Sequence, residues 1–478
     1  MCTMLVALLK KEFMEHVLSM RFVVASLLTV ILVIISLIVL KGDYTQKKEA
    51  YDLNRGAYRE QAERHDDYSD LELEGIRVES PPQKLQVSYY GLEKLEDKTA
   101  HIMAYLAPTL LGELYKSPVS ALFPTPDMLY VVGVVLSLMA FVFSYDAVSG
   151  EREAETLKLA LSYSVPRDRF ILAKWLGGYL SLMTPFAIAL VAAGVIIALS
   201  RNLGFTVAQW GAYFVAAVAS FLFIAVMFSL GLFVSCRCAR SATAIMVLLF
   251  IWVGMVLMVP NVSPYISNQI TPVTAYGVVE NKIRQRVNDE VRAFFPIMEE
   301  ERRRYAAQLR QGGQTREQAQ QELGERVDEL WNELQNNTNS IAEEEWTSYE
   351  RELNRQIGVA KMLSRISPVS SFVYITTDLA GTGVRKQLHF MRALREYQKL
   401  FRRYIHDKTK GSLGARGFFF GGEEQPEYDI SDMPMFDYEG EPLSARLAGS
   451  LLDFAMLGIE AVVLFMAAFV SFLRVDVI

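Results

Sequence analysis

The sequence predicts an α-helical integral membrane protein with six membrane-spanning helices and a mainly helical domain outside the bilayer. Two observations lead to this prediction. Of the 478 residues, 51% are hydrophobic, and long uncharged runs alternate with heavily charged ones instead of mixing with them. The uncharged runs are long enough to cross a bilayer, which takes about 20 apolar residues in a helix. Together these observations exclude a purely soluble enzyme, a collagenous or disordered chain and a small disulfide scaffold.

The spans follow an amphipathic helix over residues 1–21. There Leu5, Leu8, Phe13 and Val17 recur at helical spacing between charged residues, which predicts a helix lying in the membrane interface. The apolar run that follows is too long for the core of a cleavable signal peptide. The six expected spans are residues 22–41, 128–146, 175–200, 209–235, 242–260 and 451–473.

Basic residues near the span ends predict the orientation. They gather before the first span, in the connection 147–174, between the fourth and fifth spans, and after the sixth, whereas the short connection 201–208 holds only Arg201. Because Lys and Arg concentrate on the cytoplasmic side, we expect both termini, including the tail 474–478, in the cytoplasm of a multi-pass cell-membrane protein. Segments 42–127 and 261–450 then lie outside the cell.

The larger outer segment predicts a long antiparallel helical hairpin over residues 277–363. One apolar stripe runs from Val279 to Met298 and a second from Leu323 to Ile357. Between them, Gly312-Gly313 reads as a turn, and Thr315 with Gln318 three residues later is typical of a capping box. At about 1.5 Å per residue the arms are on the order of 50 Å long or more.

Shorter signals lie at the ends of this segment. Thr271-Pro272 and Ser367-Pro368 each suit an N-cap and a first helical position, either as a repeat with a common docking role or as coincident capping. Gly381-Thr-Gly383 lacks the strand and third glycine of a phosphate loop, so we interpret it as a turn. Residues 411–422 and 423–441 are expected to form irregular surface loops.

The sequence carries no catalytic or metal-binding motif. It has no G-x-x-x-x-G-K-[ST] phosphate loop, no H-E-x-x-H pair and no G-x-S-x-G elbow. Cys236 and Cys238 have no histidine or third thiol to complete a metal site, so we interpret them as small residues at a span end. The net charge of −6 gives no support for nucleic-acid binding. We therefore expect a protein that is not an enzyme by itself and holds no cofactor.

The connection between the second and third spans is the most informative stretch. Glu151 and Glu153 lie in the first turn of a short helix that begins at Ser149-Gly150, where carboxylates complement the helix dipole. Leu157 and Leu161 are four residues apart and form an apolar stripe that the chain itself has little to cover. Either a partner protein buries this stripe, or the segment is an ordinary basic loop.

These residues resemble the signature of ABC-2 type transporter permeases. Two positions depart from that signature, because Glu155 and Ala173 stand where glycine is usual, and we expect Glu155 to make the helix more acidic and more regular. Further likeness at 122–127, 367–372, 380–383 and 472–477 extends the resemblance over all six spans. The matching residues of the signature are Asp146, Ser149, Gly150, Glu151, Arg152, Glu153, Thr156, Leu157, Leu159, Leu161, Val165, Pro166, Arg167 and Lys174.

The resemblance implies a permease subunit, most simply of an exporter, that works with a separate ABC ATP-binding subunit holding ATP and Mg. Residues 150–163 would be the coupling helix, and a second permease copy or paralogue would complete a dimer in the lipid bilayer. Two alternatives remain: a mechanotransmitter that works an outward partner through the hairpin, and a membrane scaffold or receptor without an ATPase, which the coupling motif disfavours. The residues implied to contact the ATPase are Glu151, Arg152, Glu153, Leu157, Leu161 and Arg167.

Two carboxylates mark the sixth span. Asp453 and Glu460 are seven residues apart, about two helical turns, and so share a face. An unpaired carboxylate within the bilayer costs about 2.5–3.5 kcal/mol on insertion scales, so Glu460 should face protein or a water-filled path. The alternatives are a structural hydrogen bond and a polar point on a substrate or ion route.

Overall fold

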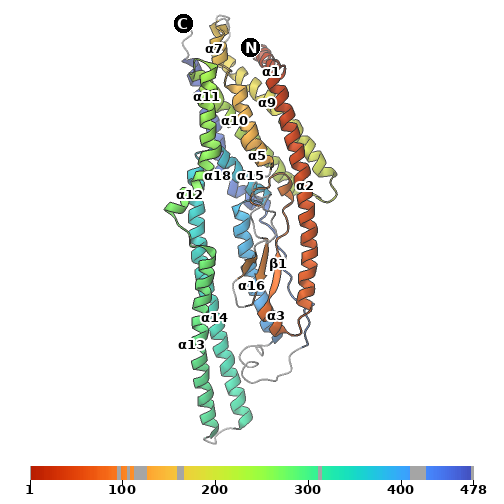
Figure 1. The fold of residues 1–478 in the computed structure, drawn as a ribbon, viewed down its shortest axis with the longest axis vertical. Coiled ribbons are helices and arrows are strands. Elements are labelled where there is room, and N and C mark those ends of the chain that lie inside the picture. The colour runs from red at the N-terminus through yellow and green to blue at the C-terminus, as the bar shows by residue number, and fades with distance from the viewer. Residues whose placement is uncertain are drawn as a thin grey trace.

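The first helix begins and the last helix ends at the same end of an elongated molecule (Figure 1), which we call the terminal end. Six helical stretches are long and apolar enough to cross a membrane, so the predicted fold class is confirmed. These stretches are Met20–Glu63, Met128–Glu153, Arg167–Leu199, Val207–Arg237, Ser241–Ile270 and Leu443–Leu473. The computed structural model describes residues 2–93, 98–104, 108–111, 126–158, 166–310, 315–409 and 427–474.

The spans pack around one central helix, α10. Of its apolar window 72% is buried within the chain, against 17% for Ser241–Ile270 and for Leu443–Leu473. Phe223 of α10 stacks on Phe372 with ring centroids 5.0 Å apart. The helical segments at this end of the molecule are α1 (Cys2–Val17), α2 (Met20–Glu63), α5 (Met128–Tyr130), η2 (Val131–Leu136), α6 (Ser137–Ser144), α7 (Ser149–Glu153), α9 (Arg167–Leu199), α10 (Val207–Arg237), α11 (Ser241–Trp252), η3 (Val253–Met258), α12 (Val259–Ile270) and α18 (Leu443–Leu473).

Two spans contain a π-helical turn, η2 and η3. In a π-helical turn the backbone hydrogen bonds join residues five apart instead of four, and such turns are often found at functional positions. Trp252 Nε1 donates to Ser137 Oγ at 2.9 Å, which joins the two spans directly after η2 and before η3. Ser367 Oγ donates to the carbonyl of Met255 within η3 at 2.5 Å. The two π-helical turns are thus linked to each other and to the start of α15.

The distal domain, at the opposite end, combines helices with a small sheet that the sequence analysis did not predict. Its strands run antiparallel in the order β1-β2-β3, with Val78 opposite Ala100. Ile76 and Ile102 pack with Phe390 and Phe401 in one apolar core. Its elements are α3 (Tyr68–Glu74), β1 (Ile76–Glu79), β2 (Thr99–Ile102), β3 (Thr109–Leu111) and α16 (Val384–Thr409), whereas η1 (Lys84–Val87) and α15 (Pro368–Ala380) pack against the spans.

The predicted hairpin consists of α13 (Tyr276–Arg310) and α14 (Arg316–Ser364), and it projects far beyond the spans (Figure 1). The predicted capping box is confirmed, since the Thr315 side chain accepts from the backbone nitrogen of Gln318 and the Gln318 side chain bonds back. The two helices share apolar clusters around Val327 and Trp346. Gly312 and Gly313 lie outside the described residues.

Three shorter predictions have different outcomes. Ser367 is the N-cap of α15 as expected, and Gly381 ends that helix in a left-handed turn with φ of 68°. The N-cap prediction for Thr271 is wrong, because Thr271 ends α12 and α13 begins only at Tyr276. A residue before proline avoids the helical conformation, which explains why α12 stops there.

The prediction of surface loops over 423–441 is also partly wrong. Residues 427–442 are irregular up to the start of α18, as expected. Ile430, Met433 and Tyr438, however, are buried in the core of the distal domain. These apolar side chains fill the space beside α16. The acidic composition of the segment does not indicate that its few apolar residues are buried. Residues 411–426 lie outside the described part of the chain.

Candidate functional site

The segment predicted to couple the permease to an ATPase lies at the terminal end (Figure 1). Its helix α7 is only five residues long, Ser149–Glu153. Glu155 has a φ of 58°, and it is the one non-glycine residue of the described part of the chain with a positive φ. The expectation of a more regular helix through Glu155 is therefore wrong. The left-handed backbone explains why glycine is usual at this position in the signature, because a Cβ atom is strained there.

Polar contacts fix α7 to the end of α10. The backbone nitrogens of Val148 and Ser149 donate to Ser235 Oγ at 3.0 and 3.1 Å. The Arg152 guanidinium donates to the carbonyls of Cys236 at 3.3 Å and Cys238 at 3.1 Å. A cation at the C-terminus of a helix is favoured by the free carbonyls and by the helix dipole. The two cysteines therefore contribute their backbone carbonyls to this contact, and both are free thiols.

Lys174 joins α7 to two other helices. Its Nζ lies 2.8 Å from Glu151 Oε1 and 3.1 Å from Glu12 Oε2, and the lysine side chain is 7% exposed. Helices α1, α7 and α9 thus meet at one buried ammonium between two carboxylates. The sequence analysis named Glu151 and Lys174 but missed Glu12, which lies more than a hundred residues away from both. No local spacing could have revealed this contact.

The neighbouring basic and acidic side chains close the junction between the first two spans. Arg21 donates to Asp146 at 2.7 Å and to the Tyr145 hydroxyl at 3.0 Å. His16 of α1 stacks on Phe143 with ring centroids 5.6 Å apart, and burial lowers the pKa of its imidazole. The Arg21 contacts hold the start of α2 against the end of the second span, and the His16 contact holds α1 against the same span.

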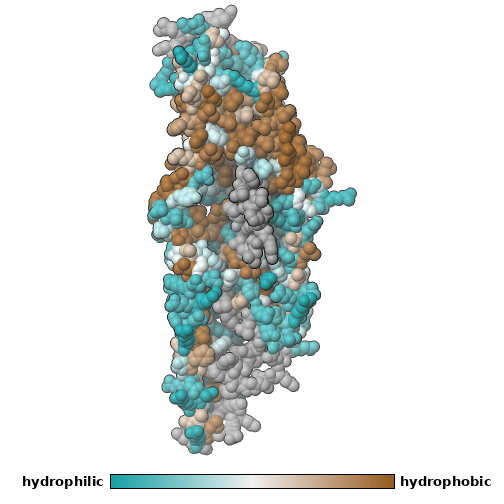
Figure 2. All heavy atoms as spheres, in the orientation of Figure 1, coloured by the Kyte–Doolittle hydropathy of each residue, from teal (hydrophilic) through white to brown (hydrophobic). Residues whose placement is uncertain are grey.

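A polar cleft of about 540 Å³ separates α1 from α7. Figure 2 shows hydrophilic side chains at this end of the molecule, next to the broad hydrophobic belt of the spans. The charged residues that line the cleft come from both helices and from the adjoining span ends. They are Lys11, Glu12, Glu15, Arg21, Asp146, Glu151 and Lys174.

The remaining residues of the predicted coupling set take different positions. Glu153 Oε2 accepts from the backbone nitrogen of Ser241, at the start of α11, at 3.2 Å. Arg167 donates to the carbonyl of Leu473, at the end of α18, at 2.9 Å. Leu161 lies outside the described residues.

Leu157 corrects the expectation of an uncovered apolar stripe. Its side chain is 3% exposed and packs with Val148, Phe170, Leu232 and Phe472. The chain itself covers this leucine, because the break at Glu155 turns the following residues back toward the spans. A partner can therefore reach the exposed residues around the break, but it does not bury Leu157.

The two carboxylates of the sixth span differ sharply. Asp453 Oδ1 and Oδ2 accept from Arg365 Nε at 2.7 Å and Nη2 at 3.1 Å, and the aspartate side chain is 1% exposed. This pair ties the C-cap of α14 to α18. One carboxylate oxygen of Glu460 is buried and has no hydrogen-bond partner within the described part of the chain.

A comparison with known families decides the identity of this architecture. The family described as ABC-2 family transporter protein matches residues 6–477, which is nearly the whole chain. The chain belongs to this ABC-2 transporter family. No curated protein matches the sequence. As an ABC-2 permease, the protein is a multi-pass membrane subunit of an ABC transporter and not itself a catalytic enzyme.

The contacts of α7 indicate how this segment of the ABC-2 permease is connected to the spans. Its polar groups contact three other helices directly: α9 through the pair Glu151–Lys174, α10 through Arg152, and α11 through Glu153. Lys174 in turn links α9 to Glu12 of α1. Most of these contacts join a charged group to a backbone end or to an opposite charge, so they are stronger than neutral hydrogen bonds. A displacement of α7 would therefore move several spans together.

Proposed function

We propose that this permease is the membrane subunit of an exporter, driven by a separate ATP-binding subunit that docks on residues 150–163. The observation that carries the proposal is the mounting of α7 on α10 through Arg152. In this proposal the terminal end faces the cytoplasm, as the distribution of Lys and Arg favours. The ATPase would hold ATP and Mg, since the sequence of this chain has no phosphate loop.

The proposed mechanism passes from the ATPase to the spans. Closure of the ATP-binding subunits would push α7, and the bonds of Arg152 and Glu153 would carry the displacement to the end of α10 and the start of α11. A second permease copy would complete the complex. The spans Ser241–Ile270 and Leu443–Leu473, each only 17% buried over their apolar windows, leave the largest faces for that copy or for lipid.

The docking test should change exposed residues of the segment and spare Leu157. Ala154 and Lys158 are exposed beside the break at Glu155. We expect Ala154→Arg with Lys158→Glu to reduce the amount of coexpressed ATP-binding subunit that copurifies by at least tenfold, because bulk and reversed charge would enter the contact. Arg201→Glu, in the exposed connection on the opposite side of the spans, is the matched control and should copurify normally. Wild-type copurification of the double variant would contradict the proposal.

Mechanotransmission is a second candidate, and one observation favours it. Helices α2 and α14, of 44 and 49 residues, run without interruption from the spans to the distal end. The Arg365–Asp453 pair couples α14 to the sixth span. Movement of α18 would therefore displace the hairpin. Transport into inverted vesicles supports export, whereas ATPase stimulation only by an outward partner, without transport, supports mechanotransmission.

We further propose Glu460 as a polar point on the route through the spans. Its support is the buried carboxylate oxygen, which has no hydrogen-bond partner among the described residues, because such a group costs several kcal/mol in an apolar region unless a substrate, an ion or another chain binds it. We expect Glu460→Gln, which keeps shape but removes charge, to lower transport while the ATPase still copurifies. Unchanged transport in this variant would leave Glu460 a structural role only.

A further inference from the structure

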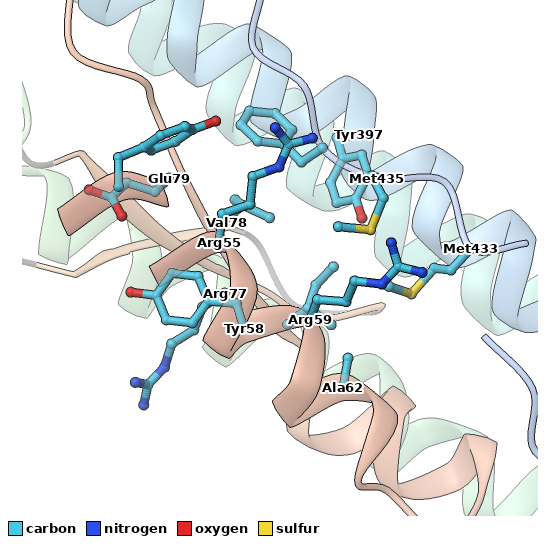
Figure 3. Close-up of a pocket in the computed structure, with 13 residues that line it drawn as sticks. Arg55, Tyr58, Arg59, Ala62, Arg77, Val78, Glu79, Tyr397, Met433 and Met435 are labelled. Carbon is cyan, nitrogen blue, oxygen red and sulfur yellow. The ribbon is translucent and has the colours of Figure 1, made fainter. Parts of the chain in front are cut away.

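A small cavity opens in the distal domain, where the outer part of α2 meets β1 (Figure 3). Its other walls are Tyr397 of α16 and the side chains of Met433, Met435 and Phe436. The cavity lies far along the molecule from α7 and the chain ends (Figure 1), so it belongs to none of the contacts described above. Its volume is about 40 Å³. A water molecule needs about 10–15 Å³ by this measure, so the enclosed part of the cavity holds about three water molecules, and a larger group that binds here would extend out through the open mouth.

The inner wall of the cavity is apolar. Val78, Tyr397 and Met433 are 5–7% exposed, and Ala62 is 2% exposed. Met435 stands at the mouth with 38% exposure. Methionine side chains are flexible and polarisable, and they pack well against aromatic and branched groups. This wall suits an aromatic or branched apolar group.

Two arginines stand at the mouth of the cavity. Arg55 and Arg59 lie four residues apart on α2 and therefore share a face. Both reach toward Tyr397 and the two methionines, whereas Arg77 points the other way (Figure 3). Arg59 pairs with Glu63 at 3.0 Å. Arg55 makes no ion pair with any residue that the structure describes.

The lining contains one acidic side chain, Glu79, and no ion pair joins it to Arg55. Glu79 Oε2 accepts from Asn54 Nδ2 at 3.1 Å, on the β1 side of the cavity. Two guanidinium groups thus stand beside an apolar cavity with one of them free to bind an anion. Guanidinium groups bind carboxylates through two parallel hydrogen bonds, which fixes the orientation as well as the charge.

We propose that this cavity binds a carboxylate with an apolar group next to it. The apolar group would fill the space between Met433 and Tyr397, and the carboxylate would bind Arg55 at the mouth. A free aromatic or branched organic acid has this chemistry, and so does the C-terminal residue of a peptide. The proposal stands on the distal cavity alone and does not depend on coupling to an ATPase.

The test is isothermal titration calorimetry of the full-length protein in lipid nanodiscs. The probes are N-acetylphenylalanine and its uncharged amide. We expect the acid to bind at least tenfold more tightly than the amide, and Arg55→Ala to remove that difference. Arg64→Ala is the matched control, because Arg64 is an exposed arginine at the end of the same helix, outside the cavity and paired with Glu60. Met435→Trp should fill the mouth and weaken binding of both probes.

Peptides distinguish the two sources of the ligand. A hexapeptide ending in phenylalanine that binds at least tenfold more tightly than N-acetylphenylalanine identifies a polypeptide end as the ligand, and equal binding identifies a free acid. Equal binding of acid and amide to the wild-type protein, or wild-type binding by Arg55→Ala, would overturn the proposal. Neither result would affect copurification of the ATPase, so the two proposals fail independently.

Discussion

Glu155 takes a backbone conformation that side chains with a Cβ atom avoid, and this single residue sets the length of α7. The chain leaves the helix at Ala154 and turns Leu157 into the core. The usual glycine of the family signature has a direct physical reason here. The sequence shows that Glu155 replaces the usual glycine. It does not show that α7 ends there, because the φ angle of Glu155 depends on how the residues on both sides pack.

The strain at Glu155 leads to a prediction with opposite signs at two positions. Glu155→Gly should raise stability by about 1 kcal/mol, since glycine adopts positive φ without a steric cost. Glu153→Gly, within the helical turn, should lower stability by about 1 kcal/mol through helix propensity and by a further amount through loss of the hydrogen bond from Ser241 to Glu153. The melting temperatures of the purified variants give both signs. A lower melting temperature for Glu155→Gly would show that the left-handed turn is not strained.

Asp127 predicts a pH dependence of stability. It is 5% exposed before α5, and it accepts from the backbone nitrogens of Tyr90 at 2.9 Å and Tyr130 at 3.0 Å. Burial raises the pKa of its carboxyl from 3.8 to about 6. The folded state therefore binds this proton more tightly than the unfolded state. This contribution to stability is complete below about pH 4 and is lost as the pH rises to about 6.

The comparison with Asp127→Asn isolates this group. At about 1.4 kcal/mol per pKa unit, the stability of the wild type relative to the variant should fall by roughly 3 kcal/mol between pH 4 and pH 7. The melting temperatures of both proteins across this range give the difference. A difference that does not change with pH would show that Asp127 titrates alike in both states.

At the scale of elements, the spans and the hairpin could be predicted because each has a long, local signal. A span needs about 20 apolar residues, and the hairpin has two apolar stripes with a capping box between them. The sheet could not be predicted in this way, since its strands are only three or four residues long. The ion pairs of Lys174 could not be predicted either. They join residues from three helices, and only tertiary packing brings Glu12 close to Lys174.

The base of the hairpin gives a prediction about two elements, α14 and α18. Removing one member of a buried ion pair leaves an uncompensated charge and costs about 3–5 kcal/mol. Arg365→Met alone should therefore destabilise the protein strongly, because Asp453 stays buried. Arg365→Met with Asp453→Leu should recover most of that loss. Thermal unfolding of the two variants measures the recovery, and equal loss in both would assign the effect to packing instead of charge.

At the scale of the whole molecule, the long axis separates two regions of different chemistry. The terminal end carries the polar cleft and α7, whereas the distal end carries the sheet, the basic cavity and the hairpin (Figures 1 and 2). Helix α14, at about 1.5 Å per residue over 49 residues, is roughly 70 Å long. The hairpin tip therefore stands far from the bilayer whichever way the protein inserts. Export and mechanotransmission both require the distal end to be outside.

Single cysteines test that orientation. With Cys2, Cys236 and Cys238 replaced by alanine, Asn336→Cys places a thiol on an exposed position of the hairpin, and Asp168→Cys places one at the terminal end. A maleimide that cannot cross membranes should label position 336 in intact cells and position 168 only after permeabilisation, because Lys and Arg at the span ends favour the cytoplasmic side. The reverse pattern would place α7 outside, where no ATPase could reach it, and would contradict the proposed coupling.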